Sequence, residues 1–106
     1  TQRFVWEKLP VNYPAKCMES GIQGVVYINI TIEPDGTTSN PEIVKSIQRK
    51  GIKGPIVEPK DEDFKLLEEE AIRAVKLSKF RTGDDYDYTN RPRIVMPITF
   101  KLSDTQ

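Results

Sequence analysis

The most regular pattern in the chain is an alternation of apolar and mixed positions over residues 24–33. One face of a strand with this period carries only branched apolar side chains, those of Val26, Ile28, Ile30 and Ile32. The opposite face also carries Asn29 and Thr31, so we expect the branched face to be buried.

A tight turn is predicted directly after this strand, at Pro34-Asp35-Gly36. Proline fixes φ and glycine accepts a positive φ, so this order of residues favours a chain reversal. Residues 37–47 should then return as an antiparallel second strand. Residues 48–60 contain two glycines, two prolines and four basic residues without periodicity, and we interpret them as a long exposed loop.

Two helices are predicted. A short helix over residues 13–21 places Pro14 at its first position and Gly21 just beyond its end. A second helix begins after Asp61 or Asp63 and runs to about residue 79. Its inner stripe consists of small and apolar side chains, namely Phe64, Leu67, Ala71, Ala74, Val75 and Ser78. Glu69 and Arg73 are spaced for an ion pair on its exposed side.

The remaining pattern predicts a short strand over residues 3–8, a polar turn region over residues 82–90 and a last strand over residues 93–102. One face of the last strand is apolar, with Ile94, Met96, Ile98, Phe100 and Leu102 in phase. The main elements predict one α+β domain over residues 1–106, with its core at about residues 9–102. Its three-stranded antiparallel sheet should carry two helices packed on one face. The expected core is Val26, Ile28, Ile30, Ile32, Leu67, Ala71, Val75, Ile98 and Phe100.

Composition adds limits on function. Sixteen basic and sixteen acidic residues give a net charge of zero, so the chain lacks the basic surface that nucleic acid or an anionic membrane requires. No apolar run approaches the roughly 20 residues that span a bilayer. Because the chain begins at Thr1 without a signal peptide, we expect a fragment or a processed product.

The chain contains no histidine, which removes the commonest general base and the commonest metal ligand. Cys17 is the only cysteine, and it is expected to be a small buried hydrophobe rather than a reactive thiol. A nucleophile needs a base beside it, and no such constellation is present. We therefore expect a binding domain without cofactor, with a carboxylate-based hydrolase as the enzymatic alternative.

Acidic residues could suggest a cation site, but their spacing does not support one. Those between residues 58 and 70 lack the pattern of a calcium loop and fit a solvated helix face. Asp84-Asp85-x-Asp87 is a weaker candidate, interrupted by Tyr86. Gly51-x-x-Gly54 lacks the Lys-Ser/Thr end of a phosphate loop, so no metal or nucleotide is expected.

Several short motifs occur in one order and spacing. They are Tyr13-Pro14, Gly21-Ile22-x-Gly24-x-Val26, Pro34-Asp35-Gly36, Ile43-Val44-x-Ser46, the helix over residues 67–75, Phe80, Gly83 and Pro97-Ile98-x-Phe100-x-Leu102. Together they resemble the C-terminal domain of the TonB energy transducers, over nearly all of residues 10–102.

This resemblance implies a periplasmic domain that docks on TonB-dependent outer-membrane transporters and supports active transport. The transporter's TonB box peptide would be added as a strand along the last strand of the sheet. The residues expected to bind it are Arg93, Ile94, Val95, Met96, Pro97, Ile98, Thr99 and Phe100, with Val11, Asn12 and Tyr13 nearby. The resemblance also implies an inner-membrane anchor and contact with motor proteins through a segment absent from this chain. A second copy of the chain is a further candidate partner.

The chain departs from the family pattern at three places. Leu9-Pro10-Val11-Asn12 replaces a glutamine-rich stretch, Ser78, Phe80, Thr82 and Gly83 replace a Trp-x-Phe/Tyr-x-Pro-Gly motif, and the loop at residues 48–60 is longer. The alternative is therefore a TonB-like docking module of an envelope sensor or a stand-alone secreted protein. Tyr13-Pro14 fits both a partner contact and a helix start that packs an aromatic ring.

Overall fold

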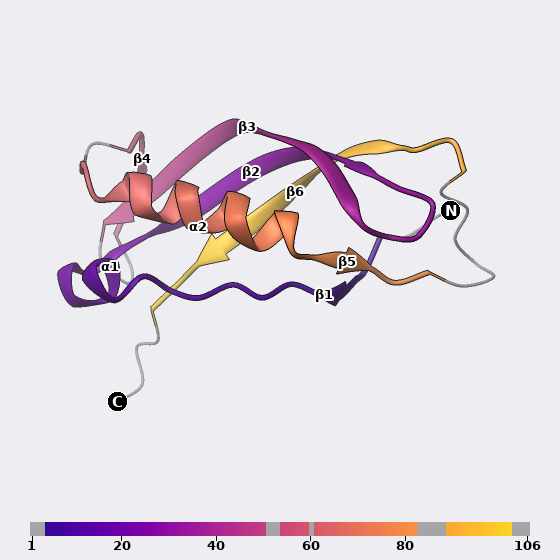
Figure 1. Ribbon diagram of the computed structural model, residues 1–106. Coiled ribbons are helices and arrows are strands. Elements are labelled where there is room, and N and C mark those ends of the chain that lie inside the picture. Colours follow the sequence, from indigo (N-terminus) through magenta and orange to yellow (C-terminus); the bar gives the residue numbers. More distant parts are fainter. Residues whose placement is uncertain (1–3, 51–53, 60, 83–88, 103–106) are drawn as a thin grey trace.

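The computed structural model describes residues 4–50, 54–59, 61–82 and 89–102 (Figure 1). The elements follow in the order β1 (Trp6–Lys8), α1 (Ala15–Ser20), β2 (Ile22–Ile32), β3 (Thr38–Lys50), β4 (Ile56–Val57), α2 (Phe64–Lys76), β5 (Lys79–Phe80) and β6 (Arg93–Phe100). The predicted α+β class is confirmed. Arg3 of the expected first strand and residues 83–88 of the expected turn region, including the Asp84-Asp85-x-Asp87 motif, lie outside the described residues.

The main sheet has four antiparallel strands in the order β4-β3-β2-β6, and β1 pairs with β5 in a separate two-stranded sheet. The prediction of three strands was therefore wrong in number. The fourth strand lies in the segment that was expected to be a loop, where Ile56 pairs with Arg49 and Val57 pairs with Gln48. Gln48 is itself buried, and its amide donates a hydrogen bond to the Asp61 carboxylate. Main-chain pairing and this polar contact order the segment without an apolar period.

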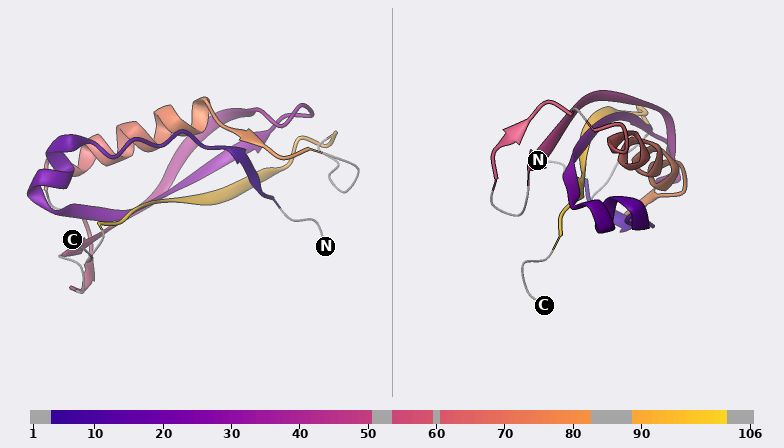
Figure 2. Two further views of the ribbon diagram at one scale, coloured as in Figure 1. Left: turned by 90° about the horizontal axis from the view of Figure 1, so that it is seen from below. Right: turned by 90° about the vertical axis from the view of Figure 1, so that its left-hand side faces the viewer.

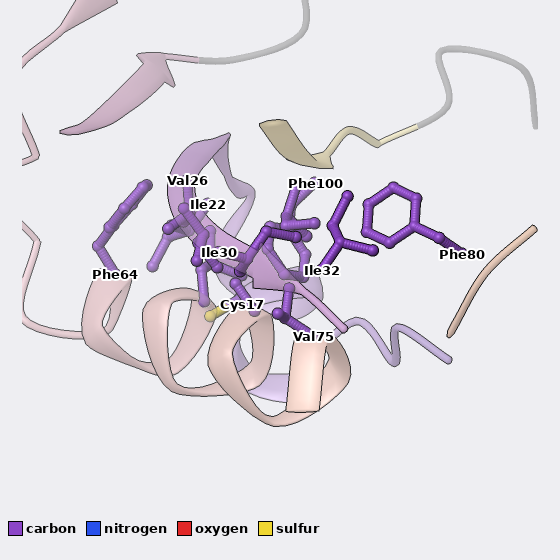
Figure 3. Packing of buried hydrophobic residues seen from close by; sticks show 13 residues of the cluster. Cys17, Ile22, Val26, Ile30, Ile32, Phe64, Val75, Phe80 and Phe100 are labelled. Carbon is purple, nitrogen blue, oxygen red and sulfur yellow. The ribbon is translucent and has the colours of Figure 1, made fainter. Parts of the chain in front are cut away.

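Both helices lie on the same face of this sheet, as expected (Figure 2). β2 supplies the centre of the core, because Val26, Ile28, Ile30 and Ile32 are completely buried. Side chains from α1, α2 and the last strand join them, and Figure 3 shows them in one cluster around β2. Every predicted core residue is buried, namely Val26, Ile28, Ile30, Ile32, Leu67, Ala71, Val75, Ile98 and Phe100.

The turn between β2 and β3 forms where the Pro-Asp-Gly sequence predicted it. The Asp35 carboxylate accepts hydrogen bonds from the Thr37 N–H at 2.9 Å and from the Thr37 hydroxyl at 2.6 Å. These hydrogen bonds lower the pKa of Asp35. Gly36 has φ of 90°, and its N–H donates to the Glu33 carbonyl. The glycine therefore supplies the positive φ on which the reversal depends.

The helix boundaries differ from the predicted ones by one to three residues. Pro14, with ψ of 129°, precedes the first helical residue instead of occupying it, and Gly21 ends α1 with φ of 70°. Helix α2 begins after Asp63, whose side chain makes no capping hydrogen bond, and ends at Lys76 instead of residue 79. The chain then pairs with β1 through β5, so tertiary pairing replaces the last helical turn.

Gly24 allows α2 to approach the sheet closely. A Cβ atom at this position would clash with the Ile47 carbonyl oxygen and with the ring of Phe64, the first residue of α2. Phe64 is buried directly beside this glycine. The Gly-x-Val motif thus has a packing role, because its glycine leaves space for an aromatic ring.

Replacing Ile30 by alanine should lower the free energy of unfolding by about 2–5 kcal/mol, because the change leaves a cavity at a fully buried position. The exposed Val44, with 49% of its surface accessible, is a control whose alanine variant should lose less than about 0.5 kcal/mol. Urea unfolding of both variants measures the difference. Similar losses at the two positions would contradict the assignment of Ile30 to the core.

Candidate functional site

The direction of the main-chain groups along β6 follows from its register with β2. The pairs run without a shift from Gly24↔Phe100 to Thr31↔Arg93, and the Ile32 N–H donates to the Pro92 carbonyl at 2.9 Å. Hydrogen-bonded and non-hydrogen-bonded pairs alternate in an antiparallel ladder. Residues 94, 96, 98 and 100 therefore bond to β2, whereas residues 93, 95, 97 and 99 direct their main-chain groups away from it.

We call the outward main-chain and side-chain positions of Arg93, Val95, Pro97 and Thr99 the β6 edge. No strand lies beyond β6 among the residues that the structure describes. The four side chains are exposed, and Val95 has 50% of its surface accessible. The other expected strip residues, Ile94, Met96, Ile98 and Phe100, pack into or against the core instead. The predicted eight-residue strip therefore contains two sets of residues with different roles.

Pro97 interrupts the row of outward N–H donors along the β6 edge. Its nitrogen faces away from β2, where a missing N–H leaves the sheet intact. Val95 and Thr99 on either side retain their outward N–H groups, and all of these residues offer a carbonyl oxygen. An added strand can thus pair with β6 on both sides of the proline but receives no hydrogen bond at it.

On the other side of β2, strand β3 is less regular than β6. The register of β3 with β2 shifts after Lys45, which pairs with Tyr27, so that Val44 is an extra residue before Ile43. A second irregularity contains Asn40, with φ of 50°, next to Pro41. Bulges and prolines discourage the pairing of an edge with another strand, and so does cover by a neighbouring segment. β4 provides such cover, because it pairs with one end of β3. The β6 edge is therefore the more suitable template for another strand.

Tyr13 connects the segment before α1 to the end of β6. Its hydroxyl donates to the Ile22 carbonyl at 2.6 Å, and its ring contacts Phe100 edge-on with 5.5 Å between centroids. Burial of the ring, together with the nearby Cys17, raises the pKa of Tyr13 to about 12. Tyr13 thus has the packing role that was one of its two interpretations.

The preceding residues are held on α2 by a clamp of Glu70 and Arg73. The Glu70 carboxylate accepts hydrogen bonds from the Asn12 N–H at 2.6 Å and from Arg73 at 2.7 and 2.8 Å. Arg73 also donates to the Pro10 carbonyl at 2.8 Å. Hydrogen bonding to Arg73, and secondarily to Asn12, lowers the pKa of Glu70.

Sequence reasoning assigned Arg73 to Glu69 and missed this clamp. Both carboxylates lie on the same helix at a spacing that permits pairing with Arg73. Glu70, and not Glu69, forms the pair, because Glu70 also accepts the Asn12 N–H from a segment 58 residues away. A contact between segments so far apart leaves no local sequence pattern. Of the three expected neighbours of the strip, Tyr13 reaches β6, Val11 packs against the core and Asn12 is held on α2.

The residues that the structure describes contain no group of three or more His, Cys, Asp or Glu side chains that could hold a metal ion. Cys17 is completely buried, and its thiol donates to the Asp63 carbonyl at 3.4 Å. Burial, reinforced by the Asp63 carboxylate, raises the pKa of Cys17. No helix in the described parts of the chain has the length and apolar character needed to cross a bilayer.

Comparison with known families concerns the first half of the chain. The family of the Gram-negative bacterial TonB protein C-terminal matches residues 10–53, which include Tyr13-Pro14, α1, β2, the turn and β3. Over these residues the match confirms the resemblance to the TonB C-terminal domain, which is a periplasmic domain. β6 lies outside the matched range. No protein among those with curated descriptions matches the chain.

Cys17 should react much more slowly with a thiol reagent in the folded protein than in urea. The side chain is fully buried and its pKa is raised, so both access and the thiolate fraction are low. Absorbance of a released aromatic thiolate gives both rates. Equal rates in the two states would place the thiol at the surface.

Glu70→Gln should destabilise the protein by about 1–2 kcal/mol at pH 7, because the clamp loses charge-assisted hydrogen bonds. The pKa of Glu70 is lowered by folding, so its contribution is present above the ordinary value of 4.5 and is lost as pH falls through the folded value. The difference from the parent protein should therefore shrink in acid.

Glu69→Gln is the matched control, because it makes the same change of charge one residue away on an exposed side chain. Its effect should stay below about 0.5 kcal/mol. Urea unfolding at neutral and acidic pH measures both variants. A larger loss for Glu69→Gln would restore the ion pair expected from the sequence.

Proposed function

We propose that the chain is the periplasmic protein-binding domain of a TonB-type energy transducer. It docks on outer-membrane transporters when the TonB box peptide of the transporter adds a strand to the β6 edge. The continuous register of β6 with β2 carries this proposal, because it leaves the outward main-chain groups of Val95 and Thr99 on the last strand of the sheet. The family match over residues 10–53 supports the same class of function.

Strand addition suits the chemistry of this edge. Main-chain hydrogen bonds supply affinity with little dependence on the sequence of the incoming peptide. Side-chain contacts then come from exposed residues of β6 that lie beside the added peptide, such as Val95. Arg93 is oriented by a 2.9 Å hydrogen bond to the Thr31 hydroxyl and a 3.7 Å ion pair with Glu42. These contacts draw its guanidinium across β2 toward β3, so Arg93 offers the β6 edge its main-chain groups rather than a free cation.

Val95→Pro should weaken binding of a transporter N-terminal peptide by about tenfold, because it removes an outward N–H from the β6 edge. Val95→Ala removes the side chain but keeps the N–H, so it is the matched control and should bind nearly as well. Backbone amide shifts during titration give the affinity and locate the contact, and the spectrum without peptide verifies the fold of each variant.

Pro97→Ala provides the opposite change in the same strand. It adds an outward N–H, so peptide affinity should not fall, and two exposed edges should pair with each other more readily. Sedimentation at increasing concentration measures this self-association. Amide shifts concentrated on residues 48–59 with a silent β6 would exclude strand addition at this edge.

A further inference from the structure

A small pocket lies on the face of the sheet that the helices leave uncovered, next to the end of β6. Its volume is about 120 Å³, and Val25, Ile47, Ile56 and Thr99 supply its apolar surface. The register places these residues on neighbouring strands, because Val25 pairs with both Ile47 and Thr99. Such a volume suits one aliphatic side chain, since sites for larger ligands occupy about 300–1,000 Å³.

Both charged side chains that line the pocket are cations. Arg49 lies on β3, where it pairs with Ile56 of β4, and Lys101 directly follows β6. Neither makes an ion pair with a carboxylate in the described part of the chain. Lys101 is exposed and Arg49 is half-buried, so both are available to an anion above the apolar floor. The pocket therefore complements an aliphatic group that has a carboxylate beside it.

The pocket is continuous with the β6 edge, because Thr99 belongs to both. A strand added to this edge would lie about 5 Å from β6, and its residues opposite Thr99 would point to the same uncovered face. Side chains two positions apart on an extended peptide share a face. An aliphatic residue and an acidic residue with this spacing can reach the floor and the cations together.

We propose that this pocket is a specificity subsite for the docking segment, which carries an aliphatic residue and an acidic side chain two positions apart. The proposal rests on strand addition at the β6 edge for the identity of the segment. The pocket itself is formed by the folded domain and can be tested without that pairing.

The capped tripeptide acetyl-Leu-Ser-Glu-amide is the probe, and acetyl-Leu-Ser-Gln-amide is its neutral counterpart. The acidic tripeptide should shift the amides of Val25, Ile47, Arg49, Ile56 and Thr99, with a dissociation constant in the millimolar range that ligands of this size reach. The neutral tripeptide should bind about threefold to fivefold more weakly. Equal binding of the two, or shifts outside the pocket, would overturn the proposal.

Variants separate the pocket from the strand-pairing site. Lys101→Gln and Arg49→Gln should each weaken the acidic tripeptide about threefold, whereas Lys45→Gln, an exposed residue that does not line the pocket, should leave its affinity unchanged. Val95→Pro should leave tripeptide binding intact while it weakens the longer transporter peptide. If the tripeptide binds the parent protein but the longer peptide shifts no amide of β6, the docking function is refuted and the subsite stands. If all three charge removals weaken the tripeptide equally, the subsite is refuted and the docking function stands.

Discussion

The pairing of β2 with both of its neighbours is the constraint on which the other features depend. Its even-numbered residues direct their main-chain groups toward β6 and send their side chains into the core, whereas its odd-numbered residues direct their main-chain groups toward β3. A shift of one residue would expose Ile28 and Ile30 and bury Asn29. A one-residue slip of β6 itself would turn the Pro97 nitrogen toward β2, where it has no N–H to donate, and would take Ile98 and Phe100 out of the core. Burial in the core therefore decides which main-chain groups of β6 remain free.

The two edge regions of the sheet differ in regularity, and β6 is the more regular of them. β3 carries a bulge at Val44 and an irregularity at Asn40, whereas β6 pairs with β2 over its whole length. Long, regular open edges expose a protein to self-association. Pro97 reduces that hazard by removing one donor, while the carbonyl groups of the β6 edge remain available to an incoming peptide.

The strongest periodicities in the sequence predicted the elements that build the core. Residues 24–33 and the inner stripe of α2 are buried as expected, because alternation and helical spacing directly report a buried face. β4 was missed because a strand of two residues, in a segment bounded by Pro55 and Pro59, is too short to show an alternating pattern. The Glu70 clamp and the outer-face pocket were missed because each joins segments that are distant in the chain. The apolar phase of the last strand already predicted which of its side chains face the core. The direction of its main-chain groups required the pairing with β2 that the Ile32–Pro92 hydrogen bond fixes.

The orientation of β6 has a mechanical consequence for any strand that joins it. The molecule measures 42 × 27 × 24 Å, and the long strands follow its longer direction (Figure 2). Hydrogen bonds of an antiparallel ladder stand perpendicular to the strands. A pull along β6 would load the bonds at Val95 and Thr99 in shear, so they would have to break together. A pull across the strand would open them one after another, and the gap at Pro97 would separate the two ruptures.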